Sequence, residues 1–171
     1  KQPQNKFKKS ILSIEQLQEN YQSIFSILKS FNPTATVVFS ISPVRHLKDG
    51  FVENNQSKAH LIAALHSVIN PSENIHYFPS YELLMDELRD YRFYKKDMVH
   101  PNQIAVDYIW EKFKSIWIDE GTNSIMQEVN QLQKGFSHKP FNPLAIEHTV
   151  FLSNLHKKAK ALESQFPFMR F

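Results

Sequence analysis

The sequence of 171 residues contains no cysteine and only three glycines, Gly50, Gly121 and Gly135. Without cysteine the chain forms no disulfide, has no thiolate nucleophile and cannot bind zinc through sulfur. The three glycines are far apart, so these residues contain no glycine-rich phosphate loop, dinucleotide fingerprint or Gly-x-Ser-x-Gly nucleophile elbow. Nucleotide binding is therefore disfavoured, and the usual sequence context of a serine nucleophile is missing.

Long hydrophobic runs and a strong excess of one charge are also lacking. An apolar run such as residues 61–65 is far shorter than the roughly 20 residues that a membrane-spanning helix needs. The 20 Lys and Arg residues exceed the 17 Asp and Glu residues by only three, and they are scattered along the chain. We expect neither a membrane span nor a nucleic-acid partner. The histidines show no metal-ligand spacing, so no metal site is expected, and no motif indicates an organic cofactor.

Hydrophobic periodicity predicts an alternation of helices and strands in the first two thirds of the chain. Residues at three-to-four spacing predict helices over 12–31, 56–69, 101–117, 122–134 and 144–165, with a short helix over 80–89. β-Branched and aromatic residues predict strands over 36–41 and 75–78. Alternation of this kind is typical of an α/β fold with a parallel sheet covered by helices.

Two strands cannot bury both faces of a parallel sheet or form a stable sheet alone. We therefore expect residues 1–118 to form an incomplete α/β domain and residues 119–171 to form a helical appendage. The missing strands would come from upstream residues or from a partner chain, with self-association as one outcome. The lack of an initiator methionine favours upstream residues.

The first candidate site follows the predicted strand over 36–41. Residues 42–46, which we call the Arg45 loop, read Ser-Pro-Val-Arg-His. In open α/β sheets ligands bind beyond the carboxyl ends of the strands. Arg45 could bind a carboxylate or phosphate, and His46 could donate a hydrogen bond or act as a base. The alternative is a structural loop in which Arg45 pairs with Asp49 or Glu53.

The second candidate site is an Asp-x-x-His-Pro sequence that precedes the predicted helix over 101–117. Pro101 suits the first position of a helix, which would place His100 at the helix entrance. Asp97 could bind one imidazole nitrogen of His100, set its tautomer and leave the other nitrogen to act as a base. The alternative is a capping turn in which Asp97 only accepts hydrogen bonds from backbone amides.

Two serines, Ser42 and Ser80, lie at the ends of predicted strands. Pro43 follows the first, and a predicted helix begins at the second, so neither has the sharp strand-turn-helix context of a nucleophile. We expect the nucleophile of any serine chemistry to be a different residue.

Five stretches together resemble the GSCFA family, which is similar to the SGNH/GDSL ester hydrolases. They are residues 42–51, 54–59, 77–82, 86–94 and 97–101. The resemblance covers roughly residues 1–118. It implies a flavodoxin-like three-layer fold, in which helices cover both faces of a parallel sheet. It also implies a Ser-His-Asp type site, whose closing Asp-x-x-His block is matched by Asp97 and His100.

The Gly-Ser-Cys-Phe-Ala motif that names the family, which should hold the nucleophile, has no counterpart here, so the chain resembles the carboxyl-terminal portion of the domain. We therefore predict an ester hydrolase or acyltransferase that acts on a small-molecule or carbohydrate acyl ester. His100 would be the base and Asp97 its orienting partner, with Ser42, Arg45 and His46 facing the substrate. The alternative is a non-catalytic binding or scaffolding protein whose C-terminal helices recruit a partner.

Overall fold

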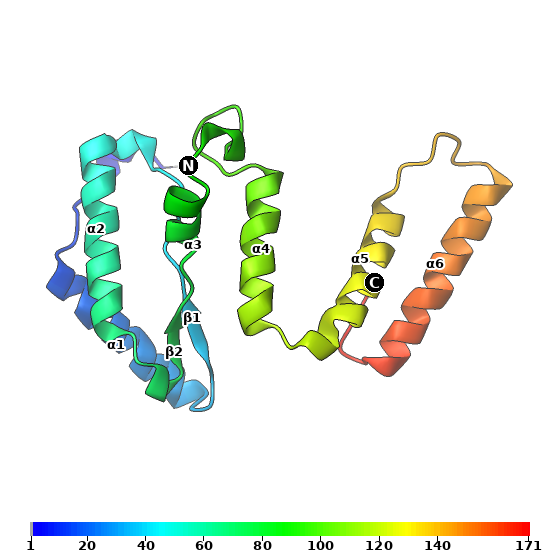
Figure 1. Cartoon of the computed structure of the whole chain (residues 1–171), viewed down its shortest axis with the longest axis horizontal. Coiled ribbons are helices and arrows are strands. Elements are labelled where there is room, and N and C mark those ends of the chain that lie inside the picture. Colours follow the sequence, from blue (N-terminus) through cyan, green and yellow to red (C-terminus); the bar gives the residue numbers. More distant parts are fainter. Residues whose placement is uncertain (1) are drawn as a thin grey trace. The chain divides into compact units, whose positions relative to one another are not determined.

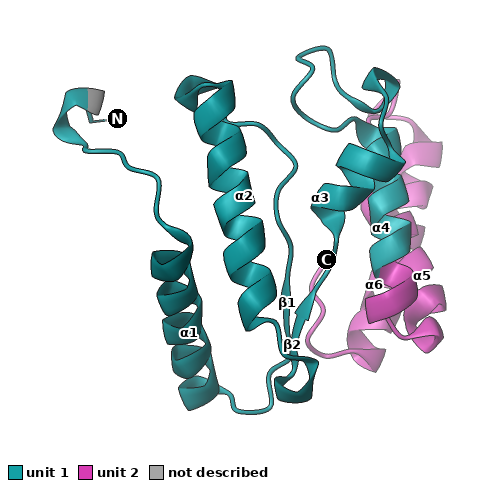
Figure 2. Ribbon diagram, turned by 60° about the vertical axis from the view of Figure 1, so that its left-hand side comes forward, with its two compact units in different colours: residues 1–113 teal, residues 114–171 magenta. Residues whose placement is uncertain are grey.

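The computed structural model describes residues 2–171 and forms two compact units, residues 1–113 and residues 114–171 (Figures 1 and 2). The elements of the N-terminal unit are α1 (Ile14–Phe31), β1 (Val37–Phe39), α2 (Phe51–Val68), β2 (Ile75–Tyr77), α3 (Ser80–Glu82) and most of α4 (Gln103–Trp117). The C-terminal unit contains α5 (Asn123–Ser137) and α6 (Ile146–Gln165). The division of the chain at residues 118 and 119 stays a sequence-based prediction.

Helix α1 begins at Ile14, two residues after its predicted start, because Ser13 caps it. The Ser13 hydroxyl accepts a hydrogen bond from the Gln16 backbone N–H at 3.3 Å, and the Gln16 side chain accepts one from the Ser13 N–H at 3.0 Å. This reciprocal capping box satisfies two amides that the helix leaves unpaired. The buried Phe25 ring contacts Phe39 edge-on, with 5.5 Å between centroids, and so anchors α1 to β1.

The two strands pair in parallel, as predicted, with Val37 opposite Ile75 and Phe39 opposite Tyr77. Among the described residues the sheet has these two strands only, and β1 is half-buried along its length. Helices α1 and α2 lie on one side of the strands and α4 lies on the other (Figures 1 and 2). The N-terminal unit is therefore mostly helical with a small two-stranded parallel sheet, which is consistent with the expected incomplete α/β domain.

Helix α2 starts at Phe51, five residues before the predicted start at residue 56. Asn54 and Asn55, which lie before the predicted start, belong to its first two turns. The helix can start early because Gly50 has a φ of +88°, a conformation that glycine adopts readily, and this lets the chain pass directly from a 3-10 turn into the helix.

The segment after β2 packs against α4 and forms a buried apolar cluster with it. The single turn α3 continues into a π-helical turn over Leu83–Glu87, where one continuous short helix was expected. Leu84 and Leu88 pack with Ala105 of α4 in a fully apolar cluster. Phe78 contacts Phe113 edge-on, with 5.1 Å between ring centroids, so α4 is fixed to the end of β2.

The C-terminal unit is a helical hairpin, in agreement with the predicted helices over 122–134 and 144–165. Its core consists of Leu132 from α5 with Leu155, Ala159 and Leu162 from α6. Helix α5 runs three residues beyond its predicted end and includes Gly135. Across residues 2–171, none of the helices combines the length and apolar character required to cross a membrane.

Gly135 allows the two helices of the hairpin to approach closely. A Cβ atom at this position would lie 2.7 Å from both terminal carbons of the buried Leu155 side chain. Overpacking of this kind costs about 1–3 kcal/mol, which exceeds the helix-propensity gain of at most about 1 kcal/mol. We predict that Gly135→Ala destabilises the hairpin by about 1 kcal/mol in denaturant unfolding followed by circular dichroism. The exposed neighbour Gln133 provides the control, since Gln133→Ala should leave stability unchanged.

Candidate functional site

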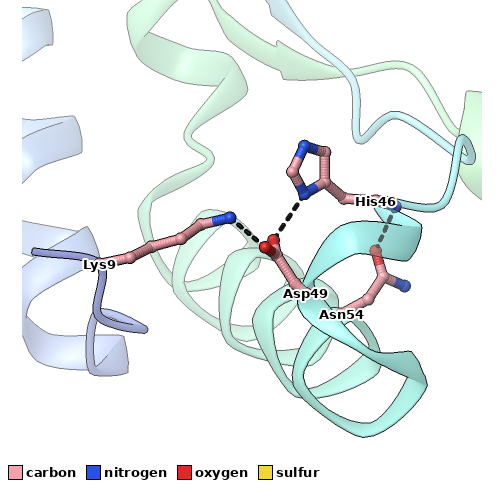
Figure 3. Close-up of polar contacts among 4 residues, drawn as sticks. All are labelled: Lys9, His46, Asp49 and Asn54. Carbon is pink, nitrogen blue, oxygen red and sulfur yellow. Dashed lines mark hydrogen bonds and ion pairs between the residues drawn. The ribbon is translucent and has the colours of Figure 1, made fainter. Parts of the chain in front are cut away.

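The Arg45 loop leaves the end of β1 and is held by side chains of α2. The side-chain oxygen Oδ1 of Asn54 accepts a hydrogen bond from the His46 backbone N–H at 2.8 Å (Figure 3). The Lys58 ammonium group donates to the Ser42 backbone carbonyl. Within the loop, the Ser42 hydroxyl accepts from the Val44 N–H at 3.2 Å. The backbone is thus fixed on both sides of Arg45.

The alternative in which Arg45 pairs with an acidic residue of the same segment is wrong. Asp49 instead accepts hydrogen bonds from His46 Nδ1 at 2.6 Å and from the Lys9 ammonium group (Figure 3). These partners, Lys9 foremost, lower the pKa of the Asp49 carboxyl. Arg45 makes no ion pair or hydrogen bond with any residue in the described part of the chain.

A cavity of about 620 Å³ lies beside the Arg45 loop and the start of α2. Residues that follow both strands line it: Arg45 comes after β1, and Tyr81 and Met85 come after β2. The Ser80 hydroxyl donates to the Ile41 carbonyl at 3.1 Å and so joins the two segments at this edge. His46 does not line the cavity, and its side chain is exposed.

Residues 97–100 form a tight turn, which we call the His100 turn. One carboxylate oxygen of Asp97 binds His100 Nδ1 at 2.8 Å. The other accepts hydrogen bonds from the backbone N–H groups of Val99, at 2.9 Å, and His100, at 3.0 Å. Asp97 therefore does what both hypotheses proposed: it orients the imidazole and it caps the turn.

The backbone amides of His100 and Val99, and then the His100 side chain, lower the pKa of Asp97 to about 2. Asp97 is therefore ionised at neutral pH. An anionic partner favours the tautomer of neutral His100 that carries its proton on Nδ1, which leaves the lone pair on Nε2. No hydrogen bond to Nε2 is found among residues 2–171, and the ring is exposed.

Backbone pairing joins the two ends of the His100 turn. The prediction that Pro101 occupies the first position of the helix is wrong. Pro101 pairs with Tyr94 in an antiparallel bridge instead of starting the helix. Helix α4 begins at Gln103, where the Asn102 side chain accepts a hydrogen bond from the Ala105 N–H at 3.2 Å. Asn102 can cap the helix with its side chain and Pro101 cannot, so the helix begins later than predicted.

The two candidate sites are linked through Tyr94 and Met85. The Tyr94 hydroxyl donates to the Met85 sulfur at 3.6 Å, and Met85 lines the cavity beside Arg45. His100 itself is not among the residues that line this cavity. The convergence of the Arg45 loop and His100 on one substrate stays a prediction.

Sequence reasoning assigned no role to Asn54 and Lys58, although both hold the Arg45 loop. They lie four residues apart, on one face of α2. Their spacing directly after the loop is the signal that could have found them. Burial lowers the pKa of Lys58. No group of three His, Asp or Glu side chains suited to a metal ion occurs in the part of the chain that the structure describes.

Comparison with protein families gives two matches. The GSCFA family matches residues 1–113, and the family described as GSCFA domain protein, C-terminal domain, matches residues 129–171. The chain belongs to the GSCFA family. The second match shows that the C-terminal helices, which the sequence-based resemblance did not include, also have counterparts in the family. No curated protein and no solved structure matches the chain.

The geometry of the His100 turn predicts the titration of Asp97. Its pKa is lowered from 3.8 to about 2, so the stability that the turn gains from the carboxylate is present above pH 3.8 and is lost as the pH falls through about 2. A carbon-13 NMR titration of the Asp97 carboxyl should give a midpoint near 2.

In His100→Ala the midpoint should remain below 3.8, because the two largest contributions come from backbone amides. An unshifted midpoint in the parent chain would show that these hydrogen bonds do not form in solution.

Proposed function

We propose that the chain forms part of an SGNH-like ester hydrolase or acyltransferase with a Ser-His-Asp type site. His100 is the general base and Asp97 orients it. The observation that carries the proposal is the hydrogen bond from His100 Nδ1 to the ionised Asp97, which leaves Nε2 exposed and able to accept a proton. In the proposal the Arg45 loop faces the acyl ester through Arg45, which lines the cavity, whereas the His46 side chain binds Asp49 outside it.

In this reaction His100 Nε2 takes the proton of a serine hydroxyl as the serine oxygen attacks the ester carbonyl. The tetrahedral intermediate collapses, and His100 returns the proton to the departing alcohol. Water then attacks the acyl-enzyme in a hydrolase, whereas another hydroxyl attacks it in an acyltransferase. Asp97 remains ionised throughout and stabilises the imidazolium form of His100.

In this proposal, residues other than these 171 supply the serine nucleophile and the hydrogen-bond donors of the oxyanion hole. Both serines at strand ends make structural hydrogen bonds: Ser42 accepts from the Val44 N–H and Ser80 donates to the Ile41 carbonyl. The half-buried β1 supports a larger sheet. In the proposal, β1 and β2 belong to a flavodoxin-like three-layer fold to which residues 1–118 contribute.

A second candidate function is non-catalytic binding through the C-terminal unit. The segment that joins α5 to α6 and the start of α6 expose three large apolar side chains, Phe141, Leu144 and Ile146. Contiguous exposed apolar residues are typical of interaction surfaces. In this alternative the fold is kept without catalysis, and the C-terminal helices recruit a partner or a second copy of the chain.

Substitution of His100 in the whole protein separates the two functions. If His100 is the base, His100→Ala should lower turnover of a generic acyl ester by several orders of magnitude, up to the roughly 10⁶-fold loss seen when a member of such a triad is removed. Asp97→Asn should cost less, because a mis-set tautomer costs roughly 10⁴-fold in a serine protease triad. Turnover by His100→Ala at the parental rate would favour the binding function.

Two controls accompany these variants. The exposed His138 in the C-terminal unit has no role in the proposal, so His138→Ala should retain parental turnover. The melting temperatures of His100→Ala and Asp97→Asn should stay within a few degrees of the parent, because the exposed turn contributes little to the core. Loss of activity that coincides with unfolding would support a purely structural turn.

A further inference from the structure

The cavity beside the Arg45 loop contains two cationic side chains and no acidic one. Arg45 and Lys58 both line it, and every other lining residue is neutral. Both cationic side chains are half-buried, so each has lost part of its hydration. A cavity with this charge distribution attracts anions and disfavours cations.

Among the described residues, no acidic side chain compensates the positive charge of the cavity. Lys58 donates to the Ser42 carbonyl, which is a neutral acceptor, and no carboxylate lies within ion-pair distance of Lys58 or Arg45 in the described residues. Acidic residues are available close by in the sequence, but Asp49 is held by Lys9 and His46. An anionic ligand would supply the missing partner and form charge-assisted hydrogen bonds with both cations.

The rest of the cavity wall is largely apolar. Phe51 and Val52 are exposed, and Tyr81 and Met85 are half-buried on the segment after β2. An unbranched aliphatic chain could bury its methylene groups against these side chains, and the binding free energy gained would grow with the apolar area buried. The cavity therefore combines a cationic part with an apolar part.

The cationic part is also held in place before any ligand binds. Hydrogen bonds from the Val44 and His46 backbone amides fix the residues on both sides of Arg45, and the acceptor of the second is Asn54 of α2. Lys58 comes from the same helix, one turn further along. A fixed backbone lowers the entropy lost on binding.

We propose that this cavity binds the anionic end of an amphipathic acyl group, with a carboxylate or phosphate between Arg45 and Lys58 and an aliphatic chain against Phe51 and Met85. The identity of the substrate rests on the proposed function: the ester that the enzyme cleaves carries a negative charge at a distance from its reacting carbonyl. Anion binding by the cavity can be tested without catalysis.

The test uses three probes with the same six-carbon chain: hexanoate, hexyl phosphate and the neutral hexanamide. Isothermal titration calorimetry of the chain should show binding of at least one anion and markedly weaker binding of hexanamide. Comparison of the two anions identifies a carboxylate or a phosphate as the preferred group. Equal affinity for hexanamide and both anions, or no binding of either anion, would overturn the proposal.

Arg45→Gln and Lys58→Gln should each weaken anion binding by about tenfold or more, since each removes a charged donor. Lys48→Gln is the matched control, because Lys48 is an exposed cation near the loop that does not line the cavity. Lys58→Gln also removes the hydrogen bond to the Ser42 carbonyl, so the loop could rearrange in this variant. Arg45→Gln breaks no such bond and therefore decides the result. Unchanged anion affinity in Arg45→Gln would contradict the proposal.

Ester cleavage and anion binding can be tested separately. If the whole protein cleaves esters but prefers diethyl adipate to monoethyl adipate, the catalytic proposal stands and the anionic substrate is wrong. If hexanoate binds in an Arg45-dependent way and no ester is cleaved, the anion site stands as the binding site of a non-catalytic protein.

Discussion

Parallel hydrogen bonding between β1 and β2 brings the residues that follow both strands to one edge of the sheet. The Val37 N–H donates to the Asn74 carbonyl at 2.8 Å and the Phe78 N–H donates to the Phe39 carbonyl at 2.7 Å, one at each end of the pairing. Because the strands are parallel, their carboxyl ends coincide, and Arg45 reaches the same cavity as Met85. An antiparallel pair would have put these residues at opposite edges. The proposed binding site therefore depends on a sheet whose paired strands are only three residues long.

The N-terminal unit contains two Asp-His pairs at a spacing of three residues, and their surroundings give them different properties. Asp49 binds His46 but is also paired with the Lys9 ammonium group, which neutralises much of its charge (Figure 3). Asp97 binds His100 and two backbone amides, so it keeps its full negative charge while its position is fixed. A fixed, uncompensated carboxylate is the better partner for an imidazole that must become positively charged. The same sequence spacing thus gives a surface ion-pair network in one case and a candidate base in the other.

Much of the fold follows from local patterns in the sequence. Apolar periodicity and the Ser13 cap define α1, and the run of β-branched residues before Ile41 identifies β1 and its parallel pairing. Element ends were less predictable, because they depend on contacts between segments: Asn54 has the sequence character of a loop residue but lies in α2 and binds the backbone of His46. The lack of an ion pair at Arg45 among the described residues could not be predicted either, because Lys9, which is 40 residues from Asp49 in the sequence, occupies the Asp49 carboxylate. The family matches lie in both units and include the C-terminal helices, which the sequence predicted as a helical appendage.

We propose that the Arg45 loop and the His100 turn act on one substrate. The most direct test is a crystal structure of the whole protein after reaction with an alkyl fluorophosphonate, which forms a stable covalent analogue of the tetrahedral intermediate on an activated serine. We expect a serine adduct within hydrogen-bond distance of His100 Nε2, with the alkyl chain directed into the cavity that Arg45 and Met85 line. An adduct on a serine distant from His100, or a cavity on the opposite side of the sheet from the adduct, would contradict it.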